Sequence, residues 1–348
     1  MHCRLLLVLA IAACGDPEPP YVPDEIDMVL DAHWLDVGAR GVTVAVRQDG
    51  VTRSYARGVA SVKDEIDLVP ADRMRVGSIT KTFTAATILQ LSDEGALSLS
   101  DPIDTWVPNF SLGPEVTIER SLGHLTGLFN FTDDSGFLNR VAVPIAPADL
   151  VAFALQHPPA FTPPGQSWSY SNTNFVLLAM VIEAVTGDDY ASVVRARFLD
   201  PLGLENTFIE GGESAPGLVP GYLLTAAPPP YDASWGFGTG SLVSNGDDLC
   251  RWVDLLYRGT VLPPPLRSLL TIESHPTDGT NTNYGVATDL RRRGGIDVVG
   301  HTGSTMGFNA EVFIDPTSGD CIAVLSNDFF GEPDVLAQPL WELVASGT

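Results

Sequence analysis

A serine and a lysine three positions apart could supply a nucleophile and its base. Ser78 and Lys81 stand at the start of residues 78–94, whose pattern predicts a helix that ends at Gly95. On a helix this spacing places the hydroxyl and the ammonium on one face. A serine hydroxyl is a poor nucleophile at neutral pH, and a buried lysine that has lost its proton can activate it. The helix N-terminus would favour the negative charge that develops on a substrate.

The alternative is a serine that caps the helix and a lysine in solvent, since Ser-x-x-Lys pairs also arise by chance. Apolar residues lie on more than one side of residues 78–94, so we expect this helix to be buried. A lysine in a buried helix needs partners, which argues against a solvated side chain.

A second group with suitable chemistry is Tyr170, Ser171 and Asn172, which precede a predicted helix over residues 174–186. A tyrosine beside a lysine can have its pKa lowered and act as a general base. An asparagine can orient the lysine and donate a hydrogen bond to a substrate amide oxygen. Alternatively, Ser171 or Asn172 only caps the helix.

The third group, His301, Thr302 and Gly303, ends an apolar segment that is typical of a strand. Gly303 would let a ligand or another backbone approach closely. The backbone N–H groups of Ser304 and Ser78 could then form an oxyanion hole. For His301 by itself, a structural histidine held by hydrogen bonds is the more common case.

The composition is that of a large acidic protein. The chain has 348 residues, 45% of them hydrophobic, and its 19 Lys and Arg against 43 Asp and Glu give a formal net charge of -24. Nucleic acids and anionic lipid surfaces repel a polyanion, so we expect neither as a partner. The six histidines form no H-x-H or H-E-x-x-H grouping, and we expect no metal and no other cofactor.

The first residues have the pattern of an export signal. Residues 1–13 contain Arg4 and an apolar run too short to span a bilayer. The run ends at Cys14 in a pattern that resembles a bacterial lipobox, with Cys14 as the lipidated first residue; an ordinary secretory signal is the alternative. Residues 14–23, which contain four prolines, are typical of an extended tether. We therefore expect an exported protein, a bacterial lipoprotein facing the periplasm or the cell surface, that contacts a membrane only through this lipid.

Two cysteines would be left in the mature chain. Cys3 would be removed with the signal and Cys14 would carry the lipid, which leaves Cys250 and Cys321. They could pair in an oxidising compartment or stay as two buried thiols. The sequence leaves both alternatives open.

Strand patterns occur towards both ends of the chain, and helical patterns occur between them. The predicted strands cover 41–46, 51–59, 284–290, 296–300, 309–314 and 321–326. Further helices are predicted over 24–37, 190–199, 247–257 and 335–344. We expect the second of these to stop at Pro201, and residues 291–295 to form a solvated hairpin turn.

The expected fold class is α+β, with an antiparallel sheet built from the N- and C-terminal segments and flanked by helices, plus a mainly helical middle region. Residues 24–348 would form this domain. Its α/β part covers about 24–77 and 237–348, and its helical part covers about 78–236.

In order and separation, Ser78-x-x-Lys81, Tyr170-Ser-Asn172 and His301-Thr-Gly303 resemble the motifs of the serine β-lactamase and penicillin-binding-protein superfamily. The Tyr-x-Asn form resembles the class C branch, which also holds DD-peptidases, D-aminopeptidases and esterases. The resemblance covers about residues 26–344 and implies the β-lactamase/transpeptidase-like fold. Further segments that agree with it are 122–128, 164–166, 201–204, 240–249 and 300–308.

The resemblance also implies a mechanism. Ser78 would attack a carbonyl to form an acyl-enzyme, with Lys81 and Tyr170 moving the proton. The backbone N–H groups of Ser78 and Ser304 would hold the oxyanion, and a water activated near Tyr170 would release the acyl group. The residues implied to bind or orient the substrate are Asn172, His301, Thr302 and Gly303.

One departure from the family pattern bears on the substrate. β-Lactamases of this branch usually carry lysine where this chain has His301, and histidine offers a weaker, pH-dependent positive charge to a substrate carboxylate. Histidine is familiar at this place in DD-peptidase and D-aminopeptidase relatives.

The first hypothesis is therefore an exported serine hydrolase that acts on D-amino-acid peptides or related amides and esters. Its partner would be a small molecule or a short peptide. The alternatives are a β-lactamase, a small-ester carboxylesterase and, in a different class, a catalytically silent module that binds a peptide or a penicillin. The intact Ser78, Lys81 and Tyr170 argue against the silent module. The sequence leaves the substrate and the oligomeric state open.

Overall fold

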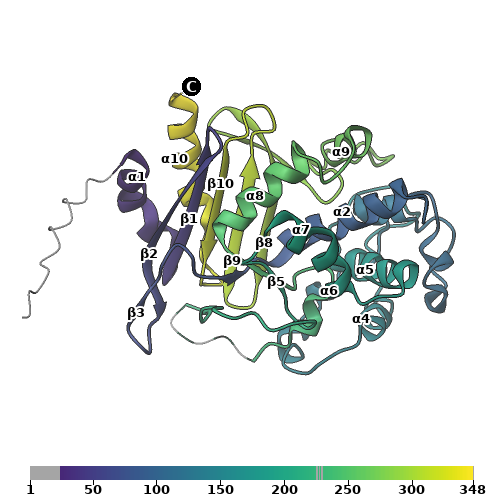
Figure 1. Cartoon of the computed structure of the whole chain (residues 1–348). Coiled ribbons are helices and arrows are strands. Elements are labelled where there is room, and N and C mark those ends of the chain that lie inside the picture. The colour runs from purple at the N-terminus through teal and green to yellow at the C-terminus, as the bar shows by residue number, and fades with distance from the viewer. Residues whose placement is uncertain (1–23, 225, 227, 229, 348) are drawn as a thin grey trace, which may run out of the picture.

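The computed structural model describes residues 24–224, 226, 228 and 230–347. Within this part of the chain, seven strands form one antiparallel sheet in the order β3-β2-β1-β10-β9-β8-β7 (Figure 1). The expected signal, the tether and Cys14 lie outside the described residues. The strands of this sheet are β1 (Gly41–Gln48), β2 (Val51–Ser61), β3 (Ile66–Asp67), β7 (Asp289–Arg293), β8 (Ile296–Thr305), β9 (Phe308–Ile314) and β10 (Cys321–Ser326).

The centre of the sheet joins the two ends of the chain. β1 pairs with β2 on one side and with β10 on the other, so that Val44 lies opposite Tyr55 and Val324. Asp49 and Gly50 both have positive φ, which gives the tight turn of the β1–β2 hairpin. The predicted α+β fold, with a sheet built from N- and C-terminal segments, is confirmed.

Helices cover both faces of this sheet (Figure 1). α1 (Glu25–His33), its 3₁₀ extension (Trp34–Val37) and α10 (Pro333–Ser346) cover one face, and α8 (Gly246–Tyr257) packs on the other. Side chains of β1 alternate between the two layers: Val44 belongs to the core under α1 and α10, whereas Ala45 belongs to the core under α8. Full burial of a side chain as large as that of Val44 stabilises the fold by about 1.5–3 kcal/mol.

The helical region surrounds α2 (Thr80–Asp93), which is buried on almost every side. Phe83 of α2 stacks on Trp252 of α8 with ring centroids 3.8 Å apart, and α5 (Asn172–Thr186) also packs against α2. This burial explains why α2 has no single apolar stripe. The other α-helices described are α3 (Ile118–Leu122), α4 (Pro147–Ala154), α6 (Tyr190–Val194), α7 (Asp200–Leu202) and α9 (Pro264–Leu270). Single 3₁₀ turns are Gly77–Ile79, Ile103–Thr105, Pro108–Phe110, Phe131–Asp133, Phe137–Asn139 and Ala233–Gly236.

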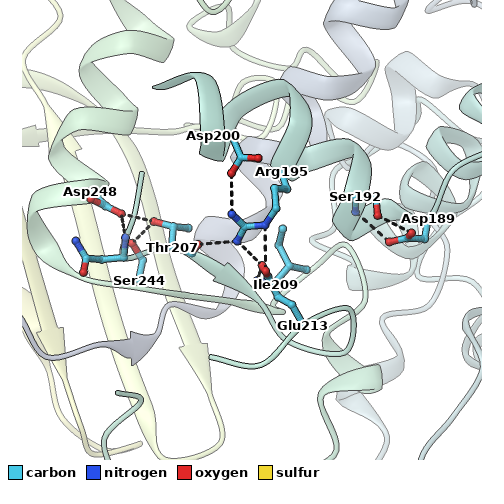
Figure 2. Close-up of polar contacts among 10 residues, drawn as sticks. Asp189, Ser192, Arg195, Asp200, Thr207, Ile209, Glu213, Ser244 and Asp248 are labelled. Carbon is cyan, nitrogen blue, oxygen red and sulfur yellow. Dashed lines mark hydrogen bonds and ion pairs between the residues drawn. The ribbon is translucent and has the colours of Figure 1, made fainter. Parts of the chain in front are cut away.

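A small antiparallel sheet connects the helical region to the segment before Ser78. It contains β4 (Met74–Arg75), β6 (Leu242–Ser244) and β5 (Phe208–Ile209), in that order. Figure 2 shows the contacts around it: the Arg195 guanidinium lies 2.9 Å from Asp200 and 2.7 Å from Glu213. Thr207 is hydrogen-bonded to Ser244 and to Asp248 of α8, both at 2.9 Å. These contacts hold β5 and β6 in place, and β6 in turn pairs with β4, which leads into Ser78.

The prediction of a solvated hairpin turn at residues 291–295 is right about the hairpin, which β7 and β8 form, but wrong about the length of the turn and the exposure of all its arginines. Residues 291–293 belong to β7, and the turn consists of Gly294 and Gly295, which both have positive φ. The Arg293 side chain is only 12% exposed and pairs with Glu311 and Asp334. Strand alternation turns it towards the layer that α10 covers, where a buried cation needs carboxylate partners.

The predicted helix end at Pro201 is also wrong. α6 continues through a π-helical turn (Arg195–Leu199) into α7, which ends at Gly203 with positive φ. In a regular α-helix, a proline lacks the N–H for its hydrogen bond and its ring clashes with the preceding turn. The wider π-helical turn just before Pro201 relieves that conflict, so the helix passes through the proline.

Cys250 of α8 and Cys321 of β10 meet in the core between the helix and the sheet. Both are buried free thiols, and their Sγ atoms lie 2.8 Å apart. Burial raises the pKa of Cys321, which disfavours its thiolate. Of the two alternatives that the sequence left open, the structure contains the two thiols.

Candidate active site

A cleft of about 700 Å³ lies where the end of β8 meets the helical region. β7 pairs with β8 only as far as Gly300. The edge of residues 301–305 that faces away from β9 is therefore not covered by β7, and these residues line the cleft. The lining comes from segments distant in the sequence, and it includes every predicted site residue except Lys81 and Cys14. Those lining residues are Ser78, Tyr170, Asn172, His301, Thr302, Gly303 and Ser304.

Ser78 lies in the 3₁₀ turn just before α2, and Lys81 lies in the first turn of α2 itself. The Lys81 Nζ atom is 2.9 Å from Ser78 Oγ and 2.9 Å from the carbonyl oxygen of Thr239. Lys81 is fully buried, and its Nζ lies 5.0 Å from the centroid of the Tyr170 ring. The alternative of a solvated lysine is therefore wrong, and the serine and the lysine are hydrogen-bonded.

The protonation states of this pair follow from burial. Burial lowers the pKa of Lys81 well below its usual value, and the nearby Asp289 carboxylate only partly opposes this by raising it. An uncharged amine at 2.9 Å can accept the proton of the serine hydroxyl. The lysine thus has the properties of the general base.

Burial also raises the pKa of Tyr170, although the hydrogen bond between this side chain and Ser78 lowers it in part. The expectation that a neighbouring lysine would lower the tyrosine pKa is wrong. That effect requires a charged lysine, whereas a buried lysine without an adjacent counter-ion tends to lose its proton. Tyr170 is consequently a neutral phenol in contact with the nucleophile, and it can donate a proton.

Two glycines let the Ser78 turn touch the end of β8. A Cβ on Gly77, whose φ is +49°, would lie 2.7 Å from the Ser304 nitrogen. A Cβ on Gly303 would overlap the Val76 carbonyl oxygen and lie 3.1 Å from the Ser78 nitrogen. The backbone nitrogens of Ser78 and Ser304 are therefore close neighbours at the cleft wall. Two N–H donors placed together beside a nucleophile have the form of an oxyanion hole.

His301 is held as a neutral ring by two hydrogen bonds. Its Nδ1 contacts the carbonyl oxygen of Thr302, which can only accept, so this nitrogen carries the proton. Nε2 then accepts from the Tyr284 hydroxyl at 3.0 Å. Burial lowers the pKa of His301, and Asp289 opposes this in part. The structure therefore favours a hydrogen-bonded structural histidine over a positive charge for a substrate carboxylate.

Asn172 is the first residue of α5 and lines the cleft. Its side-chain nitrogen donates to Thr132 Oγ1 at 3.1 Å, and its backbone N–H donates to the Asn130 side chain at 2.9 Å. Within the described part of the chain, Lys81 is held by the Thr239 carbonyl rather than by Asn172. The asparagine is placed to meet a substrate, but it does not orient the lysine.

His124 packs beside Tyr170 and was not among the predicted site residues. Its ring lies 4.3 Å from the Tyr170 ring, centroid to centroid, and its Nδ1 accepts from the backbone N–H of Ser171 at 3.1 Å. Burial lowers the pKa of His124 well below the usual histidine value, so the ring is neutral. The sequence did point to this segment, because residues 122–128 agree with the family pattern. That agreement did not single out His124.

Asp289, the first residue of β7, was also missed. Its Oδ2 accepts from the backbone N–H and the hydroxyl of Thr302, both at 3.3 Å, and lies 3.2 Å from the Arg291 guanidinium. Its carboxylate raises the pKa of Lys81, Tyr170 and His301. No local sequence signal identifies this residue, because only the β7–β8 register brings it beside Thr302.

Aromatic side chains form another wall of the cleft. Phe137 and Trp235 meet edge to face with ring centroids 5.5 Å apart, and Phe131 and Tyr231 also line the cleft. Such a surface favours an apolar or aromatic group on the substrate. Phe131, Phe137 and Trp235 lie in single 3₁₀ turns and Tyr231 lies in a loop, and periodicity carries no signal for such segments.

In the described residues, no group of three or more His, Cys, Asp and Glu side chains is arranged to hold a metal ion. Over the same part of the chain, no helix is both long and apolar enough to cross a membrane.

Comparison with known proteins assigns the chain to a family. The model of the family named Beta-lactamase matches residues 26–346. A D-stereospecific amidohydrolase from Streptomyces sp. is 31% identical, with a TM-score of 0.78, and the match covers 90% of this chain and 98% of that one. A D-amino acid amidase from Ochrobactrum anthropi SV3 shares the fold, with a TM-score of 0.81 at 24% identity over 92% of this chain and 97% of the other.

A curated relative is the unguisins hydrolase ungD' of Aspergillus campestris, which is 26% identical over 343 residues. The match covers 90% of this chain but only 62% of that protein, so the chain spans less than two thirds of this relative's length. The family model and the amidohydrolase, by contrast, account for almost all of the described residues. The chain therefore belongs to the beta-lactamase family of serine hydrolases.

Proposed function

We propose that this protein hydrolyses amides or esters of D-amino acids, or short D-peptides, through an acyl-enzyme on Ser78. The observation that carries the proposal is the 2.9 Å hydrogen bond between Ser78 Oγ and the buried Lys81 Nζ at the cleft wall. The likeness to a D-stereospecific amidohydrolase at 31% identity supports this class of substrate.

The acylation step follows from the geometry. The Ser78 hydroxyl gives its proton to the neutral Lys81 amine while Oγ forms a bond to the substrate carbonyl carbon. The carbonyl oxygen becomes an oxyanion beside the N–H groups of Ser78 and Ser304. The bond to the leaving nitrogen or oxygen then breaks, and Tyr170 donates a proton to that atom. The proton held by Lys81 restores the phenol.

Deacylation uses the same groups. A water gives a proton to the neutral Lys81 amine and attacks the acyl carbon, and the acid leaves as Lys81 returns that proton to Ser78 Oγ. The aromatic wall that includes Phe137 and Trp235 would hold an apolar acyl side chain during both steps. This wall supports phenylalanine-like acyl groups as the first substrates to try.

The decisive test is covalent labelling. A fluorophosphonate probe should label the wild type and fail to label Ser78→Ala. Ser135→Ala provides a matched control, because Ser135 is another serine that lines the cleft. Equal labelling of Ser78→Ala and Ser135→Ala would refute Ser78 as the nucleophile, and a wild type that takes no label would favour a silent binding module.

A hydrolysis panel then ranks the alternatives. D-Phenylalaninamide represents the proposed class, nitrocefin represents a β-lactamase and a short-chain nitrophenyl ester represents a carboxylesterase. The neutral His301 offers no charge to the carboxylate of a β-lactam, so we expect nitrocefin to be the poorest of the three. A higher kcat/KM for nitrocefin than for the amide would reverse this ranking.

We also propose that the protein is exported and lipidated at Cys14, on the sequence pattern that ends at this residue. Metabolic labelling with an alkyne-tagged fatty acid in a bacterial host, followed by membrane fractionation, tests both points. The wild type should carry the label and fractionate with membranes, and Cys14→Ser should lose the label. A labelled Cys14→Ser protein would contradict the proposal.

A further inference from the structure

Asp289 lies in the cleft wall that also contains Ser78, and its carboxylate already accepts hydrogen bonds from the donors around it. Asp289 Oδ2 accepts from both donors of Thr302, the N–H and the hydroxyl, and pairs with the Arg291 guanidinium at 3.2 Å. Among the described residues, its other oxygen, Oδ1, has no hydrogen-bond partner. The Asp289 side chain is 18% exposed and lines the cleft.

This wall is where the leaving group of the substrate would lie. Tyr170, which would donate the proton to the leaving atom, has its ring 6.4 Å from that of His301, and Thr302 is the next residue along β8. The backbone nitrogens of Ser78 and Ser304 lie next to Gly303, so a substrate carbonyl held by them would lie close to Thr302, the residue before it. The group beyond the scissile bond therefore faces Thr302 and Asp289.

A carboxylate on that group would find an unfavourable environment. The N–H and the hydroxyl of Thr302 already donate to Asp289, and the Arg291 guanidinium is already paired with the same carboxylate. His301 is held as a neutral ring. The incoming anion would also lie close to the Asp289 carboxylate, and like charges brought together at a binding surface oppose association. An amide or amine would instead find Oδ1 ready to accept an N–H.

We propose that Asp289 selects substrates by the charge of their leaving group, accepting neutral amides and amines and rejecting leaving groups that bear a carboxylate. This inference rests on the proposed function and narrows it. It favours D-amino-acid amides and esters over peptides cut before a C-terminal residue with a free carboxylate, and over β-lactams, which carry a carboxylate. Asp289 acts here as a specificity residue and does not take part in the chemistry.

The test uses three esters of D-phenylalanine that differ only in the alcohol: the methyl ester, the glycolamide ester and the glycolate ester. Each kcat/KM is divided by the rate of hydroxide hydrolysis of the same ester, which removes intrinsic reactivity. For the wild type we expect the glycolamide ester to exceed the glycolate ester by on the order of tenfold or more, mainly through KM.

Two variants should move this ratio in opposite directions. Asp289→Asn keeps the shape and an acceptor for Thr302 but removes the charge and releases Arg291, so the ratio should fall by roughly tenfold. Arg291→Gln leaves Asp289 without its cation, so the ratio should rise. Asp134→Asn is the matched control, because Asp134 also lines the cleft, its side chain is 16% exposed, and the ratio should not change.

The outcomes separate the two proposals. If the methyl ester is not cleaved in a Ser78-dependent way, the proposed function fails. If the methyl ester is cleaved but the wild-type ratio of glycolamide to glycolate ester is near one, the assignment of Asp289 is overturned and the hydrolase proposal stands. The same conclusion follows if Asp289→Asn and Arg291→Gln give the same ratio as Asp134→Asn. Because Arg291→Gln tests the opposite direction, the role of Asp289 can be decided even with a poorly folded Asp289→Asn protein.

Discussion

The contact between the Ser78 turn and β8 can be tested by adding a single methyl group. In Gly303→Ala the new Cβ would overlap the Val76 carbonyl oxygen and lie 2.8 Å from its carbonyl carbon. Non-bonded carbon atoms pack at about 3.5–4.0 Å, so the end of β8 must move from the Ser78 turn by roughly 1 Å. That movement separates the backbone nitrogens of Ser78 and Ser304.

Gly303→Ala should greatly reduce the rate of acylation but only modestly reduce the free energy of unfolding. A misplacement of about 1 Å, or the loss of one oxyanion donor, costs on the order of 100- to 1000-fold in rate. Overpacking by one methyl group costs about 1–3 kcal/mol, which is less than the roughly 5–15 kcal/mol that stabilises a typical domain. Gly303→Ala should therefore remain folded and acylate slowly.

The assay is the rate of labelling by a fluorophosphonate, with thermal unfolding measured on the same sample. Gly240→Ala is the matched control, because a Cβ there lies next to the same turn but meets its nearest atoms at 3.7–3.9 Å. The control should label within a few-fold of the wild type. A folded Gly303→Ala protein that labels as fast as Gly240→Ala would refute the oxyanion hole.

Three further outcomes follow from the structure. The acylation rate should fall at low pH, where Lys81 becomes protonated, and pH–rate profiles measure this fall. In Asp289→Asn the fall should occur at lower pH, because the carboxylate that raises the Lys81 pKa is gone. Burial raises the pKa of Glu311 to about 7, so the free energy of unfolding should fall as the pH rises from about 4.5 to 7. Relative to Glu311→Gln, the fall should reach up to roughly 3 kcal/mol, measured by urea unfolding at each pH. A pH-independent difference would contradict this. Phe83→Ala, which removes the ring stacked on Trp252, should cost about 3–5 kcal/mol and change the tryptophan fluorescence; a loss below about 1 kcal/mol would contradict the packing.

Local patterns predicted the elements of this fold because the helical and strand periods are properties of short segments. The hairpin of β1 and β2 and the helix after Ser78 are examples: their apolar spacing and turn residues are visible in the sequence. The errors occurred where the surroundings of a residue, and not its type, changed the outcome. Arg293 is buried by its carboxylate partners, and Pro201 is accommodated by a π-helical turn.

For the site, motif order led to the hypothesis that Ser78, Lys81 and Tyr170 carry the chemistry, and the structure places these three side chains in contact. Their protonation states were not accessible in the same way. A pKa depends on desolvation and on charges nearby in space, and the sequence order contains neither. The expectation for Tyr170 was wrong for this reason, and the neutral state of His301 became evident only from its two hydrogen bonds.

By itself, the sequence indicated a serine nucleophile and two side chains, Lys81 and Tyr170, that could act as its base, since three-residue spacing and turn chemistry act locally. The tertiary structure alone decided that Lys81 is buried against Ser78, that two glycines bring the Ser78 turn against β8, and that Asp289 lies beside Thr302. These features depend on strand register and on the exclusion of water, which arise only when segments far apart in the sequence pack together.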